Sequence, residues 1–241
     1  MARVLAYHRP GTIDDALELL KRPGAVALGG GTQVNSTPGS SPVEVVDLQG
    51  LALDKILPLH GGRLAIGSGV TLRALSLSQD VPPVVREAAR RELPSTLRAM
   101  ATVAGTLVSA EADSELIAAL LAYEATVAFV APTGSATIDL TELLADPAVR
   151  KGSLITTVTI ETSGTARAER TGRTPADRPI VAAVARRAHG RLRLALSGVA
   201  STPSLVADVE ALDPPGDYRG SSEYRKALAT VLASRAGKGS E

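Results

Sequence analysis

Three consecutive glycines end a short apolar segment near the N-terminus, in the order Leu28-Gly29-Gly30-Gly31-Thr32-Gln33-Val34. Without side chains, the backbone N–H groups at such a strand end can turn toward a bound anion, usually a phosphate. The run lacks the G-x-G-x-x-G spacing, is not followed by lysine and does not lead directly into a helix, which excludes a Rossmann site and a P-loop. Either another nucleotide-binding fold or a tight turn accounts for it.

A second segment of small residues follows later, Ala101-Thr102-Val103-Ala104-Gly105-Thr106-Leu107, inside a predicted loop from Thr96 to Val108. Polar Arg98, Ser109 and Glu115 flank it. Two such loops could clamp one diphosphate, because converging amides and hydroxyls hold its charge without a basic side chain. The alternative is a close-packed turn between helices.

The composition narrows the classes of function. The chain has 241 residues, with 26 Lys and Arg against 25 Asp and Glu. These charges are scattered, without a basic stripe and interleaved aromatics, which argues against a nucleic-acid partner. The absence of cysteine excludes disulfides, a thiol nucleophile and any iron–sulfur cluster ligated by this chain, and it favours a reducing compartment.

The histidines and the apolar segments exclude further classes. Only His8, His60 and His189 occur, widely separated. We therefore predict neither a metal site nor a histidine-based triad, and no catalytic side chain. No apolar run reaches the length of a membrane span, and residues 1–5 lack the apolar region of a signal peptide. We expect a cytoplasmic protein without a membrane span.

The pattern of apolar residues predicts an α+β chain that begins with a small βαβ lobe, residues 1–55. Short apolar runs indicate strands at Val4–Tyr7, Ala25–Leu28 and Val43–Leu48. Between the first two strands, Thr12 with Asp15 three residues later has the N-cap pattern of a helix that continues to Leu20.

The pattern of apolar residues in 56–162 predicts a second, mostly antiparallel α+β lobe. It is expected to contain strands from Ile56, at Leu64–Ile66, Val127–Val130, Thr137–Leu140 and Leu154–Ile160, and helices at Thr71–Leu77, Val84–Arg91 and Glu115–Ala122. The polar stretch Thr162–Arg178 is interpreted as a linker or mobile loop. Residues 163–241 then form a small C-terminal domain, with a hairpin of Ile180–Arg186 against Leu192–Val199 and a helix at Ser222–Arg235.

Both loops resemble those of one protein family. Residues 28–34 are similar to the Leu-Ala-Gly-Gly-Thr-Asp-Leu loop, and residues 101–107 to the Ala-Thr-Ile-Gly-Gly-Asn-Leu loop, of the FAD-binding (medium) subunits of molybdenum hydroxylases, the xanthine dehydrogenase and carbon monoxide dehydrogenase family. Further similar segments lie along nearly the whole chain: Tyr7–Pro10, Val46–Leu48, Ile66–Thr71, Gly152–Ile155, Leu196–Ala200 and Ser221–Arg225.

This resemblance implies that the lobes 1–55 and 56–162 form an FAD-binding domain whose two loops wrap the FAD diphosphate. It implies cofactor contacts for the residues of both loops and three others: Leu28, Gly29, Gly30, Gly31, Thr32, Gln33, Val34, Thr71, Thr102, Val103, Ala104, Gly105, Thr106, Glu115 and Ile155. Glu115 would reach the ribose side, although a helix dipole also favours an acid at this position. Ile155 would contact the flavin, or belong to the core.

The chain departs from the family pattern at four positions. Ala104 replaces a glycine and Thr106 an asparagine or aspartate in the second loop, and Gln33 replaces an acid or serine in the first. Glu169 falls where family members often carry a cation. These departures favour one alternative, a degenerate subunit that keeps the fold but serves as a scaffold without flavin.

The resemblance also implies partners. The chain would move electrons from [2Fe-2S] clusters on a small iron–sulfur subunit, beside a large molybdopterin subunit, through FAD to NAD⁺, a quinone or oxygen, in a dimer of heterotrimers. A stand-alone FAD-dependent oxidoreductase is a further alternative.

Overall fold

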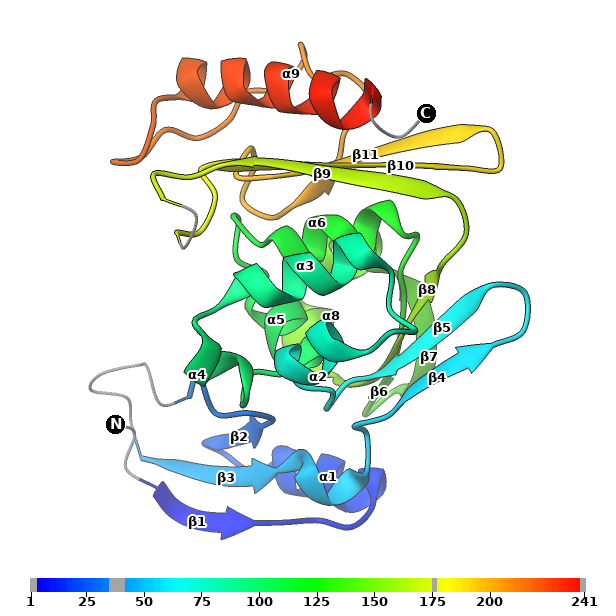
Figure 1. The fold of residues 1–241 in the computed structure, drawn as a ribbon. Coiled ribbons are helices and arrows are strands. Elements are labelled where there is room, and N and C mark those ends of the chain that lie inside the picture. The colour runs from blue at the N-terminus through cyan, green and yellow to red at the C-terminus, as the bar shows by residue number, and fades with distance from the viewer. Residues whose placement is uncertain (1–3, 35–41, 175–176, 239–241) are drawn as a thin grey trace.

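The computed structural model of the chain describes residues 4–34, 42–174 and 177–238. Its described part contains three sheets with helices between and around them (Figure 1). The N-terminal sheet lies at one end, the C-terminal sheet lies at the other, and a layer of helices fills the middle (Figure 1). The predicted α+β class is confirmed.

The N-terminal sheet is parallel, in the order β1-β3-β2. Its elements are β1 (Val4–His8), α1 (Ile13–Leu20), β2 (Ala25–Leu28) and β3 (Val43–Asp47), followed by the 3-10 helix η1 (Leu48–Leu51). Thr12 caps α1 as predicted, because its Oγ1 accepts a hydrogen bond from the amide of Asp15 at 3.1 Å. Ala16 and Val46, both fully buried, pack together with Leu154 of the next lobe.

The middle sheet is antiparallel throughout, in the order β4-β5-β8-β6-β7. Its strands are β4 (Ile56–Leu59), β5 (Arg63–Gly67), β6 (Thr126–Ala131), β7 (Gly134–Asp139) and β8 (Leu154–Glu161). The accompanying helices are α2 (Leu72–Leu77), α3 (Pro83–Glu92), α4 (Ser95–Arg98), α5 (Val103–Ser109), α6 (Glu115–Ala122), α7 (Leu140–Ala145) and α8 (Pro147–Gly152).

The C-terminal sheet, in the order β12-β11-β10-β9, carries the long helix α9 on its outer face (Figure 1). Its elements are β9 (Thr165–Thr171), β10 (Val181–Ala188), β11 (Arg191–Ser197), β12 (Ser204–Leu205) and α9 (Ser222–Lys238). The hairpin around His189 and Gly190 forms as predicted. Val184 and Ala195 belong to the same apolar cluster as the helices of the middle lobe. The division into domains at residues 55 and 162 stays a prediction.

Two segments differ from the sequence-based expectations. The predicted loop Thr96–Val108 contains α4 and α5. Val103, Thr106 and Leu107, all buried, have helical spacing, but the small residues between them concealed it. The predicted linker Thr162–Arg178 contains the strand β9, whose residues pair with β10. The partner strand β10 is the next one along the chain, but the polar composition of β9 concealed the strand.

Arg186 of β10 ties the C-terminal sheet to the end of α6. Its side chain is 0% exposed. Nε donates to the carbonyl of Ser163 at 2.9 Å, and Nη1 donates to Glu124 Oε1 at 2.9 Å and to the carbonyl of Ala122 at 3.4 Å. The guanidinium also lies 5.1 Å from the centre of the Tyr123 ring, a cation–π distance. One buried side chain therefore connects two layers.

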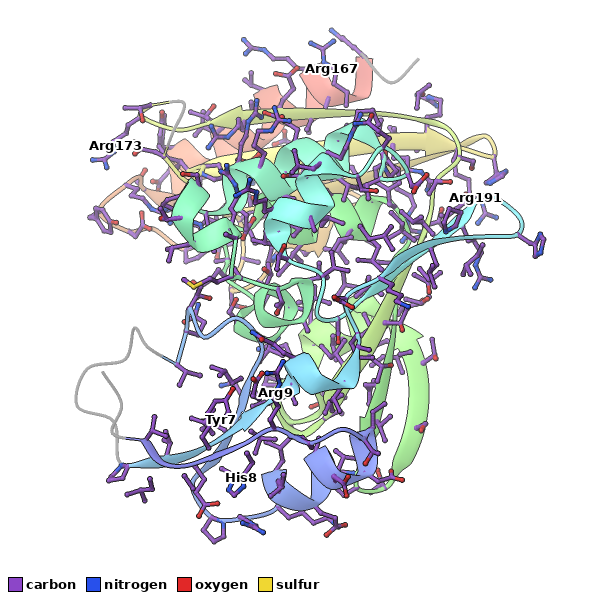
Figure 2. All side chains as sticks on the ribbon, turned by 60° about the horizontal axis from the view of Figure 1, so that its bottom comes forward. Tyr7, His8, Arg9, Arg167, Arg173 and Arg191 are labelled. Carbon is purple, nitrogen blue, oxygen red and sulfur yellow. The ribbon has the colours of Figure 1, made fainter. Side chains whose placement is uncertain are left out.

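Replacing this arginine should loosen the junction between the layers. We expect Arg186→Leu to lower the free energy of unfolding by about 3 kcal/mol, because two carbonyls and Glu124 lose their donor. Arg191→Leu is the control, since Arg191 lies exposed at the hairpin (Figure 2). Its replacement should change the free energy of unfolding by no more than about 0.5 kcal/mol. Denaturant unfolding measures both, and equal losses would contradict the role of Arg186.

A pH-dependent contact lies beside this junction. Glu161 Oε1 accepts the amide of Ser163 at 2.9 Å, and Oε2 lies 2.9 Å from His189 Nε2. These hydrogen bonds, chiefly that from the Ser163 backbone, lower the pKa of Glu161 from 4.5 to about 2. Because the folded pKa is below the unfolded one, ionised Glu161 stabilises the fold above pH 4.5, and this contribution is lost as the pH falls toward 2.

We therefore expect Glu161→Gln to destabilise the chain by about 1–2 kcal/mol near neutral pH, after allowance for solvent screening. The difference from wild type should shrink as the pH falls below 4.5. Denaturant unfolding of both proteins across this range measures it. Glu18→Gln, on an exposed helix face, is the control. A loss of unfolding free energy in Glu161→Gln that does not change with pH would contradict the stabilising role of ionised Glu161.

Candidate functional site

The first glycine loop directly continues β2. Leu28 ends the strand, Gly29 to Gly31 follow, and Thr32 to Val34 form a turn. Gly31 has a φ of +73°, a left-handed conformation that a side chain would strain. The amides of Gly30, Gly31 and Thr32 make no hydrogen bond to another described residue, so they are free to bind an acceptor.

The second segment is the start of a helix and not a loop. Thr102 is the N-cap of α5, and its Oγ1 accepts the amide of Gly105 at 3.2 Å. The amides of Val103 and Ala104 donate to the carbonyls of Val70 and Ser68, at 2.9 and 3.0 Å. The first-turn amides of α5 are therefore used within the chain. Thr106 Oγ1 also donates to the carbonyl of Thr102 at 3.2 Å, so this segment offers its surface and the hydroxyl hydrogen of Thr102.

The two segments meet through their backbones. A Cβ placed on Gly30 would lie 1.7 Å from the carbonyl oxygen of Met100, and one on Gly29 would lie 2.9 Å from Thr102 Oγ1. No side chain fits at position 30 unless the main chain moves. The space beside the Cα of Gly30 is filled by the carbonyl of Met100. Gly30 is needed to bring the segments together.

A small cavity of about 40 Å³ lies where the segments meet. Its wall combines residues of both segments with residues of α3, the α5–α6 connection and the β9–β10 connection: Thr32, Gln33, Glu92, Leu93, Ala101, Thr102, Gly105, Thr106, Ser109, Glu111 and Arg178. The cavity is far smaller than a dinucleotide, whose bulk would have to extend outside it. The free amides and adjacent hydroxyls fit the diphosphate portion of FAD.

Two other predicted contacts, Thr71 and Ile155, differ in their distance from the cavity segments: Thr71 adjoins the second segment, and Ile155 is buried in the core. Thr71 is the N-cap of α2, accepts the amide of Ala74 at 3.1 Å, and pairs with Thr102 in an isolated β-bridge, so it adjoins the second segment. Ile155 lies in β8 opposite Phe129, 4% exposed, within the main core. Its contact with flavin stays a prediction.

Glu115 lies at the start of α6 and is only 5% exposed. Arg170 Nε is 2.5 Å from its Oε1, and Arg91 Nη1 is 3.9 Å from Oε2. Burial raises the pKa of Glu115, and the two arginines oppose this shift. The described structure thus gives Glu115 cationic protein partners, and its contact with ribose stays a prediction. Glu169 pairs with Arg167 and does not line the cavity.

Sequence reasoning missed several residues of the cavity wall, among them the ion pair Glu92 and Arg178. Arg178 Nη2 lies 2.9 Å from Glu92 Oε1 and 3.3 Å from Asp113 Oδ1. Glu92 is buried, and its other oxygen accepts the amide of Leu116 at 3.1 Å. Burial raises the pKa of Glu92, and Arg178 opposes this shift. Because these residues are far apart in the sequence, no local pattern identifies them.

Comparison with known proteins identifies the class. Residues 3–161 match the family described as "FAD binding domain in molybdopterin dehydrogenase", and the chain belongs to this family. The predicted resemblance to FAD-binding medium subunits of molybdenum hydroxylases, the oxidoreductase class and the FAD cofactor are thereby confirmed.

Individual relatives agree with this class. The chain is 30% identical to "Uncharacterized protein YgfM" of Escherichia coli strain K12, over 94% of this chain and 92% of the relative. It is 26% identical to the carbon monoxide dehydrogenase medium chain of Afipia carboxidovorans, over 95% of this chain and 94% of the relative.

Solved structures share the fold. A chain of Cu,Mo-CO dehydrogenase superposes with a TM-score of 0.86 at 24% identity, covering 98% of this chain and 97% of that one. A chain of quinoline 2-oxidoreductase from Pseudomonas putida 86 superposes with a TM-score of 0.85 at 21% identity, covering 98% of this chain and 96% of that one. At these identities the likeness supports the fold alone.

Two kinds of feature are absent from the part of the chain that the structure describes. Among residues 4–34, 42–174 and 177–238, no helix combines the length and apolar character needed to cross a membrane. Within the same ranges, no group of three or more His, Cys, Asp or Glu residues is placed to hold a metal ion.

The contact of Gly30 with Met100 makes a direct prediction. Gly30→Ala should lower the free energy of unfolding by about 1–3 kcal/mol, because the new methyl group forces the two segments apart. Gly11→Ala is the control, since a Cβ there meets no atom within 4 Å. Thermal or denaturant unfolding would compare them, and wild-type stability in Gly30→Ala would show that the segments do not pack as described.

Proposed function

We propose that this chain is the FAD-binding, electron-transfer subunit of a molybdopterin-dependent hydroxylase or dehydrogenase. The observation that carries the proposal is the meeting of the Gly29–Gly31 loop with the N-terminus of α5, beside a cavity lined by Thr32 and Gln33, which follow the loop, and by residues of α5. These segments come from opposite lobes, and together they present neutral donors suited to a diphosphate.

In this proposal the amides of Gly30, Gly31 and Thr32 hold the diphosphate from one side. The surface of α5 at Thr102–Thr106 lies against it from the other. When bound, the isoalloxazine of FAD supplies the redox chemistry. The protein binds and orients the cofactor, and no side chain of this chain acts as an acid or base.

The proposed partners are a large molybdopterin subunit and a small subunit with [2Fe-2S] clusters, in a cytoplasmic dimer of heterotrimers. The absence of cysteine supports this arrangement, because the chain lacks the usual ligands of such clusters. A relative named as a medium chain of carbon monoxide dehydrogenase also supports it. NAD⁺ or another acceptor, such as a quinone or oxygen, would take the electrons from the flavin.

A second candidate function is a scaffold subunit without flavin. One observation favours it: the first-turn amides of α5 are bonded to Val70 and Ser68, which leaves the free amides on the first loop alone. FAD binding separates the two candidates.

The purified chain should bind FAD in a one-to-one ratio, measured by quenching of flavin fluorescence and by flavin release on denaturation. Gly105→Leu should weaken binding by about tenfold or more, because the new side chain enters the cavity wall. Gly105 is exposed on α5, so the variant should fold normally. Gly11→Leu, in open space, is the control. A folded wild-type chain without FAD would favour the scaffold, and unchanged affinity in Gly105→Leu would contradict the proposed contact.

A further inference from the structure

Arg178 stands on the wall of the cavity facing the two proposed diphosphate segments. The cavity is lined by Thr32 and Gln33 from the first and by residues of α5 from the second, and Arg178 is the only cationic residue among those that line it. The two segments themselves contain no lysine or arginine between Leu28 and Val34 or between Ala101 and Leu107. A dianionic group bound there would find its nearest lining cation on Arg178.

One corner of the Arg178 guanidinium is held in place. Its Nη2 contacts Glu92 at 2.9 Å and Asp113 at 3.3 Å. Glu92 is itself held by the amide of Leu116, and Asp113 is held by Arg219 at 2.7 Å. The guanidinium is therefore positioned before any ligand arrives, which reduces the entropy lost on binding.

The rest of the guanidinium remains available. Nε and Nη1 of Arg178 make no hydrogen bond to another described residue, and the side chain is 32% exposed. An arginine with two free N–H directions can bind two phosphate oxygens at once. Arg178 is therefore positioned through Nη2, while Nε and Nη1 remain available to donate to a ligand.

The charges around Arg178 are largely paired. Arg178 pairs with Glu92 and Asp113, and Arg219 pairs with Asp113 and Asp217. The residues that line the cavity include two acids, Glu92 and the exposed Glu111, and one cation, Arg178. Arg178 is therefore the lining residue whose charge can offset that of a bound diphosphate.

We propose that Arg178, in the wall of the cavity that Thr32, Gln33 and residues of α5 also line, binds the diphosphate of the cofactor. This inference rests on the proposed function. It identifies Arg178 as a binding residue that increases affinity for phosphate-bearing ligands and has no selectivity for the flavin ring.

The test uses the full chain and three probes: FAD, ADP and riboflavin. Fluorescence quenching measures FAD and riboflavin, and calorimetry measures ADP. Arg178→Gln should weaken FAD and ADP binding by about tenfold or more, because charge-assisted bonds to phosphate are lost, and should leave riboflavin unchanged. Arg173→Gln is the matched control. Arg173 lies in the same connection, is 73% exposed at the edge of the molecule (Figure 2) and is not among the residues that line the cavity.

Removing Arg178 leaves the buried Glu92 without its cation, which could impair folding. Two further variants address this. Arg178→Lys keeps the charge but not the paired N–H groups, and should bind FAD with intermediate affinity. The double variant Glu92→Gln/Arg178→Gln removes both charges, and should bind FAD and ADP as weakly as Arg178→Gln.

The outcomes separate cleanly. Wild-type affinity for FAD in folded Arg178→Gln or in the double variant would overturn the inference and leave the proposed function standing. A loss confined to riboflavin would also overturn it, because Arg178 would then face the flavin ring. A folded wild-type chain that binds neither FAD nor ADP would overturn the proposed function and this inference together.

Discussion

The complete burial of α6 is the constraint on which the rest of the structure depends. Every residue from Glu115 to Ala122 is buried, and the helix packs against α3 on one side and against β10 and β11 on the other. A helix that is apolar all round is stable only when protein covers it on every face. The middle lobe and the C-terminal sheet must therefore both be present, and their separation is set by the thickness of one helix.

The two ends of α6 carry the polar groups that this burial leaves to be satisfied. At its start, Glu92 and Ser114 accept amides of the first turn. At its end, Arg186 donates to the carbonyl of Ala122. Such partners are required because unpaired polar groups are costly in a core. The cavity lies near the first end because Glu92, while satisfying the helix, also holds Arg178.

Much of the fold could be predicted because its signals are local. The cap at Thr12, the apolar run of α6 and the hairpin at Gly190 each depend on neighbouring residues. The start of α5 was missed because its first amide bonds to the carbonyl of Val70, a residue distant in the sequence. The strand β9 was missed because its residues are mostly polar, although it pairs with the next strand along the chain, β10. In the site, the two small-residue segments could be found by their composition and resemblance. The pairing of Glu92 with Arg178 joins residues 86 positions apart, so it could be identified only from the folded structure.

The approach of Gly30 to Met100 has a consequence for how this protein can change over evolutionary time. The contact is made by main-chain atoms on both sides, so the identity of residue 100 has little influence on it. Substitutions can accumulate around the junction without altering how the lobes meet, provided that position 30 stays a glycine. The geometry that positions the cofactor segments is thus insulated from most mutational drift.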